Sequence, residues 1–266
     1  MFTLAFGLED VRIQKTADYL TLLTRPLQKM ATPDLIGKTA LVTGGNRGIG
    51  KAIALALAEA GARVCICGRN AETLSAATDL LNQRTPGAFY NVTDVRSEED
   101  QLALFRKIRE QYDRLDICVP SAGEATLACV SETRLADWNR DIETNLTGLF
   151  MTCREALNMM KEQRSGVIIP IVSQAGTKAF LLRAAYCASK WGALGFSHCL
   201  ALEAKNHGVR VVPICPASVA TDFQKNNPHG TEWMMLPEDI AGCVLYVLGL
   251  SERVDIDEIV LKTRLK

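Results

Sequence analysis

Residues 38–60, KTALVTGGNRGIGKAIALALAEA, decide the fold of this chain. The segment begins with a short apolar run, continues through the glycine-rich turn Thr43–Gly50 and ends in a sequence typical of a helix. A strand, turn and helix in this order bring backbone N–H groups and the positive end of a helix dipole to a pyrophosphate, and Gly44, Gly48 and Gly50 leave room for its approach. Such a turn can also be a tight connection, and its three residues between the first two key glycines differ from the GxGxxG spacing. Its place at the first strand–helix junction favours the phosphate-binding interpretation.

The alternation of apolar runs and amphipathic stretches continues to the C-terminus. Strands are expected at 38–43, 63–68, 88–91, 116–120, 166–172, 209–215 and 258–262. Helices are expected between them, at 49–60, 71–82, 98–111, 135–160, 185–206 and 237–250. This pattern predicts a single α/β domain over residues 37–266, with a Rossmann-like, doubly wound parallel sheet of seven strands and helices on both faces.

Residues 1–36 lie outside this pattern. Leu20, Leu23 and Leu27, interrupted by Pro26, fit a short amphipathic helix that packs on a partner subunit or on the edge of the sheet. An unpaired arm fits the same residues equally well. We therefore treat this segment as an N-terminal extension of undecided structure.

The composition excludes several classes of protein. Thirty basic and thirty acidic residues cancel within 266, and no long run of one sign provides the surface that nucleic acid or an anionic membrane requires as a partner. No run of eighteen apolar residues occurs, and the opening MFTLAFGLEDVR lacks the basic start of a signal peptide. We expect a cytoplasmic protein.

The nine cysteines are scattered, mostly within apolar stretches, which predicts reduced and buried thiols. Cys65 and Cys67 alternate along an expected strand and face the same layer, but no second Cys/His pair with ligand spacing follows them. The three histidines are dispersed as well. We predict no metal site.

The end of the second expected strand indicates which dinucleotide binds. An NAD-binding protein usually places a carboxylate here for the ribose 2′-hydroxyl, whereas this chain has Arg69, with Arg47 in the glycine turn as a second positive charge. A guanidinium is suited to a 2′-phosphate, so NADP(H) is the expected cofactor. Arg69 as a solvated loop residue is the alternative. After the third strand, Asp94 can accept a hydrogen bond from the adenine amino group while Val95 covers the ring.

Tyr186 and Lys190, in YCASK, are four residues apart in an expected helix and therefore project from nearly one face. An ammonium about 4 Å from the phenol oxygen, at an effective dielectric constant of about 20, contributes about 4 kcal/mol, or roughly three pKa units. We therefore expect the pKa of Tyr186 to approach neutrality, where a phenol serves as acid or base. Ser173 ends an apolar strand and can hold a substrate oxygen. Asn145, in ETNLTG, can bridge a water to Lys190 through a local helix distortion.

Taken together, TGGNRGIG, Asn145 in NLTG, Ser173, YCASK and PASVAT resemble the short-chain dehydrogenase/reductase family in order and spacing, from about Lys38 to the C-terminus. The resemblance implies that Tyr186 is the acid/base and that Lys190 binds the nicotinamide ribose and lowers the tyrosine pKa. It also implies that Ser173 orients the carbonyl and Asn145 maintains a proton relay. The cofactor contacts that we expect are Gly44, Asn46, Arg47, Gly48, Ile49, Gly50, Arg69, Asp94, Val95, Ala122, Gly123, Tyr186, Lys190, Pro216, Val219 and Thr221, the last two at the nicotinamide carboxamide.

Two motifs depart from the family pattern. Pro120-Ser121-Ala122-Gly123 stands where NNAG is common, and Pro216-Ala217 stands where PG is common. The first change replaces two amide side chains that tie neighbouring strands and the cofactor ribose in the family, which puts the positioning of the nicotinamide in question. Neither change removes a reacting group.

The substrate is not identified by the sequence. Residues 222–236 follow a cofactor-binding strand, where the family carries a substrate lid, and Phe223, Trp233, Met234 and Met235 suit either a cover over an apolar substrate or a seal against the core.

Three functions follow from these motifs: an NADPH-dependent carbonyl reductase, an NADP-linked alcohol dehydrogenase, and a catalytically silent nucleotide-binding scaffold suggested by the altered PSAG segment. The partners expected are a small carbonyl or alcohol substrate and further copies of the chain, as a homodimer or homotetramer. The apolar positions expected at that interface are Leu146, Leu149, Phe150, Leu157, Trp191, Leu194 and Phe196.

Overall fold

A computed structural model describes residues 32–221 and 231–264. The amphipathic helix or arm that we considered at the N-terminus lies outside the described residues, as does Phe223. The described chain begins with alternating units: β1 (Thr39–Thr43), α2 (Gly48–Glu59), β2 (Arg63–Gly68), α3 (Ala71–Asn82), β3 (Phe89–Val92), α4 (Glu98–Tyr112) and β4 (Ile117–Pro120). Across residues 32–221 and 231–264, no helix is both long and apolar enough to cross a bilayer.

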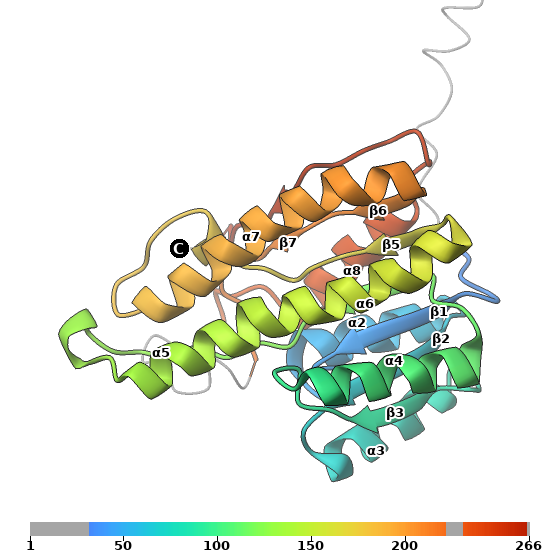
Figure 1. Ribbon diagram of the computed structural model, residues 1–266, viewed down its shortest axis with the longest axis horizontal. Coiled ribbons are helices and arrows are strands. Elements are labelled where there is room, and N and C mark those ends of the chain that lie inside the picture. The colour runs from blue at the N-terminus through green and yellow to red at the C-terminus, as the bar shows by residue number, and fades with distance from the viewer. Residues whose placement is uncertain (1–31, 222–230, 265–266) are drawn as a thin grey trace, which may run out of the picture. The chain divides into compact units, whose positions relative to one another are not determined.

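The second half of the domain continues the alternation with longer helices. It contains η1 (Val130–Glu132), α5 (Leu135–Ile142), the π-helical turn η2 (Glu143–Thr147), α6 (Gly148–Gln163), β5 (Gly166–Ile168), η3 (Gln174–Gly176), α7 (Ala184–Ala204), η4 (Lys205–His207), β6 (Val209–Val211), β7 (Ile214–Cys215), α8 (Pro237–Leu248) and β8 (Ile259–Val260). Figure 1 shows α6 and α7 lying alongside one another.

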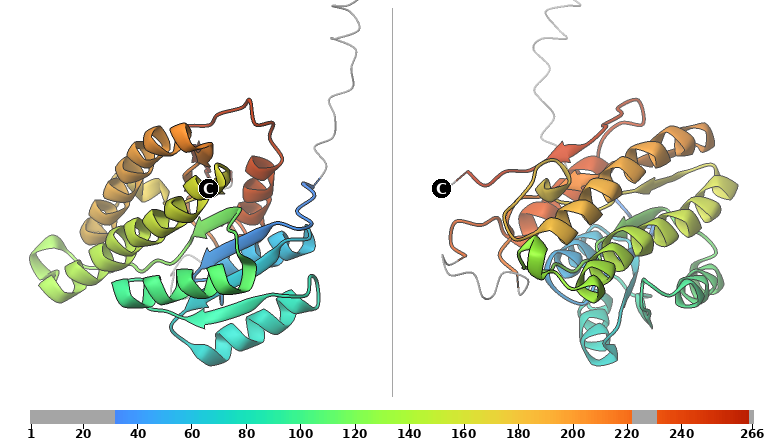
Figure 2. Two further views of the ribbon diagram at one scale, coloured as in Figure 1. Left: turned by 45° about the vertical axis from the view of Figure 1, so that its right-hand side comes forward. Right: turned by 60° about the vertical axis from the view of Figure 1, so that its left-hand side comes forward.

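The central sheet is parallel, in the order β3-β2-β1-β4-β5-β6. The order reverses between β1 and β4, and a doubly wound sheet binds its ligand at such a reversal, beyond the carboxyl ends of the strands. The α/β fold with helices on both faces is therefore as predicted. Figure 2 shows the helices on either side of the sheet.

The two faces of the sheet carry separate apolar layers. Ala40 and Val42 of β1 pack on one side with residues of α2, α3 and α8, whereas Leu41 packs on the other side with residues of α4, α6 and α7. Burial on both faces explains why the strands have apolar side chains in succession. Together the layers fix the carboxyl ends of β1, β4 and β5 in a rigid frame.

The C-terminal strands do not complete the seven-stranded sheet that we expected. The predicted run 209–215 divides at Pro213, which has no N–H to donate, into β6 and β7, and β8 pairs with β7 instead of extending the six-stranded ladder. The Val172 N–H donates to the Ile214 carbonyl over 2.8 Å, so β7 still continues the hydrogen bonding of the sheet. The six-stranded sheet and the short β7–β8 pair thus replace a single seven-stranded sheet.

The long helix predicted at 135–160 is interrupted. Residues 143–147 form a π-helical turn between α5 and α6, and Asn145 lies within it. Such turns add one residue to the helix and often occur at functional sites. The local distortion expected at Asn145 is therefore present.

Candidate active site

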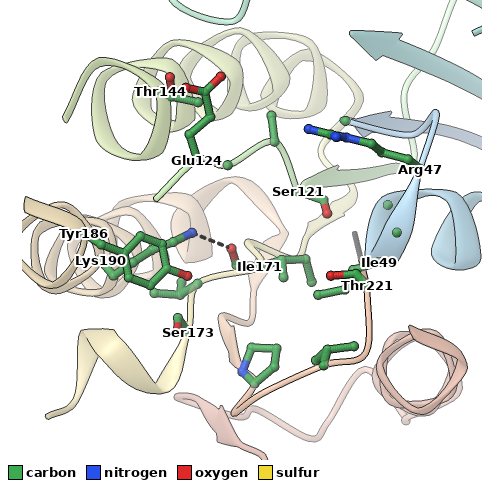
Figure 3. A pocket seen from close by; sticks show the side chains of 18 of the residues that line it. Arg47, Ile49, Ser121, Glu124, Thr144, Ile171, Ser173, Tyr186, Lys190 and Thr221 are labelled. Carbon is green, nitrogen blue, oxygen red and sulfur yellow. Dashed lines mark hydrogen bonds between the residues drawn. The ribbon is translucent and has the colours of Figure 1, made fainter. Parts of the chain in front are cut away.

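A cavity of about 990 Å³ opens at the carboxyl ends of the strands. Every residue predicted to contact the cofactor lines it, and so does Ser173. Figure 3 shows Ser173, Tyr186 and Lys190 on one side of the cavity, with Arg47 and Ile49 on the opposite side. Asn145 is the predicted site residue that does not line the cavity, because its side chain is buried behind the wall.

The glycine turn has the backbone geometry that an anion-binding loop needs. Gly44 and Gly48 have φ angles of +65° and +54°, a region that L side chains rarely adopt. A Cβ on Gly50 would lie 2.4 Å from the Gly44 carbonyl oxygen, so the tight turn excludes a side chain there. The turn thus leads its backbone directly into the first turn of α2.

The N-terminus of α2 is prepared for an anionic ligand. Its N-cap, Arg47, makes no side-chain capping bond and the first turn holds no acidic residue. By contrast, Asn70 and Ser97 cap α3 and α4 with their side chains, and both of those helices carry acids in the first turn. The open N–H groups and the helix dipole of α2 fit the pyrophosphate of a dinucleotide.

The loop after β4 is tied to β1 despite its departure from the family motif. The Thr43 hydroxyl oxygen accepts hydrogen bonds from the N–H groups of Ser121 and Ala122, over 3.0 and 3.1 Å. A Cβ on Gly44 would meet Ala122 Cα at 3.1 Å, so the loop and the glycine turn are in close contact. The Thr43 hydroxyl and two backbone N–H groups therefore tie this loop to β1 without the two amide side chains of the family motif.

The side chain of Asn145 binds the backbone of Glu124, which follows Gly123 in this loop. Its Oδ1 accepts from the Glu124 N–H over 2.9 Å, and its Nδ2 donates to the Glu124 carbonyl over 2.8 Å and to the Ser189 hydroxyl over 3.0 Å. A Cβ on Gly123 would lie 3.2 Å from Asn145 Oδ1 and 3.8 Å from Lys190 Nζ. Both polar atoms thus border the small space above Gly123.

The ammonium of Lys190 is buried and donates to the Ile171 carbonyl oxygen over 3.2 Å. Burial lowers its pKa from 10.5 to about 8. The amine is therefore mostly protonated at neutral pH and loses its proton readily in mildly alkaline solution. Its Nζ lies 5.8 Å from the centre of the Tyr186 ring.

The pKa of Tyr186 contradicts the sequence-based expectation. Burial raises it above the ordinary value of 10.0, and a hydrogen bond with Ser173 and the charge of Arg183 oppose that effect without overcoming it. The expected shift toward neutrality is therefore wrong for two reasons. Desolvation of the phenolate outweighs the nearby positive charges, and the Lys190 amine deprotonates before the phenol does.

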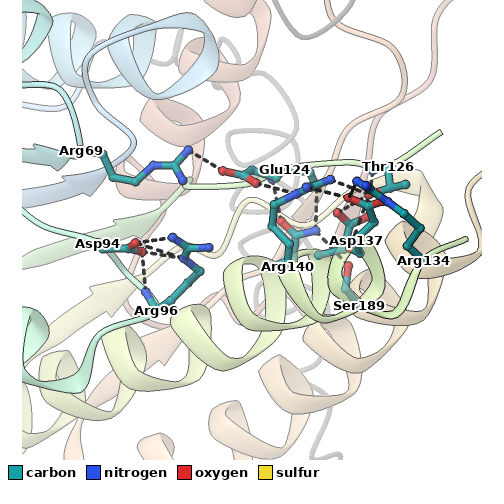
Figure 4. A network of polar contacts seen from close by, with 11 residues as sticks. Arg69, Asp94, Arg96, Glu124, Thr126, Arg134, Asp137, Arg140 and Ser189 are labelled. Carbon is teal, nitrogen blue, oxygen red and sulfur yellow. Dashed lines mark hydrogen bonds and ion pairs between the residues drawn. The ribbon is translucent and has the colours of Figure 1, made fainter.

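At Arg69 the cavity contains a carboxylate that the sequence did not reveal. Glu124 forms ion pairs with Arg69 and with Arg140, the latter over 3.3 Å. Figure 4 shows this network running from Arg69 to α5. The end of β2 has no carboxylate of its own, as expected, but the loop after β4 brings Glu124 to Arg69. The sequence feature that could have indicated this carboxylate is Glu124, which directly follows the PSAG segment.

Asp94 also lines this end of the cavity, but Arg96 holds its carboxylate. The Arg96 Nη2 lies 2.5 Å from Asp94 Oδ2, and hydrogen bonds from Arg96 lower the pKa of Asp94. Asp94 is therefore ionised at neutral pH. Val95 is buried beside it.

The segment that we considered as a substrate lid divides between the two alternatives. Trp233 lines the cavity, whereas Met234 is buried and Met235 packs against the core. In the described part of this segment, therefore, the tryptophan faces the site and the methionines seal the domain.

The cysteines show no sign of a ligand site. Six of them are buried, but Cys129 and Cys199 are exposed, contrary to the expectation of general burial. Cys65 and Cys67 do face the same apolar layer, and burial raises the pKa of both thiols. Among residues 32–221 and 231–264, no three His, Cys, Asp or Glu side chains gather as a metal site would require.

Comparison with known proteins identifies the family. Residues 38–232 match the model of the short chain dehydrogenase family. The chain is 40% identical over 224 residues to a D-threitol dehydrogenase of Mycolicibacterium smegmatis, covering 80% of this chain and 86% of that protein. It is 38% identical over 189 residues to the 3-oxoacyl-(acyl-carrier-protein) reductase FabG of Escherichia coli, covering 71% and 76%.

Solved structures agree with this result. A Thermococcus sibiricus alcohol dehydrogenase in complex with 5-hydroxy-NADP superposes with a TM-score of 0.80 at 27% identity, covering 86% of this chain and 97% of that chain. A short-chain type dehydrogenase/reductase of Mycobacterium marinum gives a TM-score of 0.81 at 28% identity, covering 86% and 96%. The chain therefore belongs to the short-chain dehydrogenase family, and it is an oxidoreductase that transfers hydride between a nicotinamide cofactor and a small-molecule substrate.

Proposed function

We propose that the protein uses NADP(H) to interconvert a carbonyl compound and its alcohol, with Tyr186 as the acid/base. The observation that carries this proposal is the convergence of Ser173, Tyr186 and Lys190 on one cavity with the uncapped N-terminus of α2. The bound nicotinamide supplies or accepts the hydride. The protein binds the cofactor, orients the substrate oxygen and moves the proton.

In this proposal each catalytic side chain has one part. The Ser173 hydroxyl and the Tyr186 phenol are within hydrogen-bonding reach of one another and hold the substrate oxygen between them. Because burial keeps the phenol protonated at neutral pH, Tyr186 is ready to donate its proton in the reductive direction. Lys190 stabilises the phenolate that develops, and a water between Asn145 Oδ1 and Lys190 Nζ returns the proton.

The test is a panel of carbonyl and alcohol substrates. NADPH oxidation is followed with ketones, aldehydes and 3-oxoacyl thioesters, and NADP⁺ reduction with polyols including D-threitol, since relatives carry the corresponding names. We expect turnover that depends on Tyr186. Binding of NADPH without turnover of any compound would favour the nucleotide-binding scaffold instead.

The choice of NADP(H) gives a separate prediction. The guanidinium of Arg69, partly exposed and lining the cavity, is proposed to bind the 2′-phosphate with the help of Arg47. Arg69→Asp is expected to raise the Kd of NADPH by at least about 10-fold and to leave that of NADH unchanged or lower, because a charge-assisted contact becomes a repulsion. Titration of cofactor fluorescence measures both. Equal affinity for NADPH and NADH in the wild-type protein would overturn the assignment.

We also propose a homodimer or homotetramer. Phe150 on α6 and Trp191 on α7 remain 41% and 53% exposed, whereas Leu149 and Leu194 are buried within the chain and leave the interface set. Light scattering after size-exclusion chromatography is expected to give the mass of two or four chains, and Trp191→Glu to lower it, because a charge would lie in the contact. A wild-type monomer would contradict this proposal.

Three further assignments rest on the sequence pattern. Residues 37–266 are proposed as the catalytic domain and residues 1–36 as an extension, in keeping with a family match that begins at residue 38. A cytoplasmic location is proposed from the nine unpaired cysteines.

A further inference from the structure

The catalytic end of the cavity carries a second cation, Arg183, three residues before Tyr186. Arg183 lines the cavity, and its guanidinium carbon lies 5.8 Å from the centre of the Tyr186 ring. It is the N-cap of α7, but its side chain makes no capping bond, and the helix start uses its backbone carbonyl, which accepts from the Cys187 N–H over 2.7 Å. The start of α7 therefore does not use the guanidinium group of Arg183.

Glu124, which lines the cavity, and Asp141, whose charge acts on Tyr186, have other partners. Glu124 pairs with Arg69 and Arg140. Asp141, which burial leaves with a raised pKa, accepts hydrogen bonds from the N–H and hydroxyl of Thr126 over 2.9 and 3.0 Å.

Two cations at this end have no carboxylate partner within residues 32–221 and 231–264. Neither the Arg183 guanidinium nor Lys190 Nζ, which donates to a neutral carbonyl, forms an ion pair there, whereas the carboxylate of Glu124 is held by Arg69 and Arg140. Within the described part of the chain, therefore, two cations lie beside the phenol, and the charge of Asp141 opposes their effect on it.

We propose that the substrate carries an anionic group, a carboxylate or a phosphate, which Arg183 binds while Ser173 and Tyr186 hold the carbonyl oxygen. This inference rests on the proposed function and adds the substrate class to it. A guanidinium presents two parallel N–H groups to such an anion and is weakly hydrated, so it suits a partly buried site better than an ammonium does. Phe180 and Trp233 line the same cavity and are proposed to contact the carbon chain between the two groups.

The reaction itself stays balanced and unchanged. The carbonyl carbon gains the hydride from NADPH, the carbonyl oxygen gains the proton of Tyr186, and NADP⁺ and a hydroxy acid or hydroxy phosphate are released. Arg183 forms no bond in this step. It orients the substrate through the anion, so its loss should matter for substrates that carry one.

The test compares matched substrates that differ in one charge. We would measure kcat/KM for 2-, 3- and 4-oxo acids against their methyl esters, and for dihydroxyacetone phosphate against dihydroxyacetone. The variants are Arg183→Gln and, as a control of equal charge change, Lys178→Gln. Lys178 is an exposed cation of the same loop, 5.1 Å from the Phe180 ring, and it does not line the cavity.

The wild-type protein is expected to prefer at least one anionic substrate to its neutral partner. Arg183→Gln should then lower kcat/KM for the anion by about 10- to 100-fold and for the neutral partner by less than about threefold, since charge-assisted hydrogen bonds are lost in the first case only. Lys178→Gln should leave both values near wild type. Preference for oxo acids or for the phosphate identifies the anion.

Two outcomes would overturn the proposal. The first is a wild-type preference for the neutral member of every pair. The second is an equal loss on both members in Arg183→Gln, which indicates that Arg183 acts through the pKa of Tyr186, a role that a shifted pH profile on the neutral substrate would reveal. In either case, Tyr186-dependent turnover of the neutral compounds would leave the proposed function intact, so the two failures are distinguishable.

Discussion

Replacing Tyr186 by phenylalanine is expected to lower kcat/KM by about 10²- to 10⁴-fold, which is the range that a positioned general acid contributes. The phenylalanine ring keeps its place beside Lys190 and Arg183, whose cations lie 5.8 Å from the ring centre. What is lost is the hydroxyl that carries the proton and its hydrogen bond with Ser173. The Kd of NADPH is expected to change by less than about threefold, because the lining of the cavity is otherwise unaltered.

Steady-state kinetics on the best substrate of the panel and fluorescence titration of NADPH measure these two effects. Tyr246→Phe is the matched control, since Tyr246 is an exposed tyrosine on α8, in the helical layer that packs on the other side of the sheet from α7. It should behave as the wild type. A Tyr186→Phe variant that retains more than a tenth of the wild-type kcat/KM would rule out the phenol as the main proton donor.

The glycine turn could be predicted from sequence because its requirements are local. Positive φ angles at Gly44 and Gly48 and the close approach of Gly50 to the Gly44 carbonyl concern residues within seven positions of one another. The same is true of the helical spacing of Tyr186 and Lys190, which places both side chains at the cavity. Local sequence spacing was therefore enough to predict most of the residues that line the cavity.

Features that depend on contacts between distant segments could not be read in this way. Glu124 meets Arg69 across fifty-five positions of sequence, and Thr43 holds Ser121 across seventy-eight. The lack of an N–H at Pro213 is visible in the sequence, but the pairing of β7 with β8 depends on a distant segment that no local pattern locates. Such pairings follow from the order of the strands in the sheet.

The wrong prediction for the pKa of Tyr186 also arises because burial depends on contacts between distant segments. A helical spacing of four residues indicated that Lys190 and Tyr186 are neighbours, but it gave no measure of burial. In the folded chain both groups are withdrawn from water, which raises the pKa of the phenol and lowers that of the amine to about 8. In the proposed mechanism, Lys190 would therefore act on Tyr186 as a cation during proton transfer at neutral pH, while burial keeps the pKa of the phenol above its ordinary value.

Lys190→Met is expected to abolish most activity and to stabilise the protein at the same time. An ammonium at 5.8 Å from the ring centre attracts a developing phenolate by roughly 3 kcal/mol at an effective dielectric constant of about 20, so its loss should lower kcat/KM by at least about 100-fold at pH 7. In the wild-type reductive reaction the same attraction should fade above pH 8, where the amine loses its proton. Methionine fills a similar volume without a charge.

The stability gain and its pH dependence follow from the pKa of the amine. In the folded wild-type protein the pKa of Lys190 is about 8 instead of 10.5, so keeping the amine protonated at pH 7 destabilises the fold by about 3 kcal/mol. In the variant the Ile171 carbonyl loses its hydrogen bond, which destabilises the variant by about 1 kcal/mol. The variant should therefore gain about 2 kcal/mol in the free energy of unfolding. Since the unfolded chain binds the extra proton between pH 8 and 10.5, the wild-type cost is fully present below pH 8 and disappears as the pH rises toward 10.5. Urea unfolding of both proteins at pH 7 and pH 10 should show the gap closing, whereas a gap that is constant or widens with pH would mean that Lys190 is not held as a buried cation.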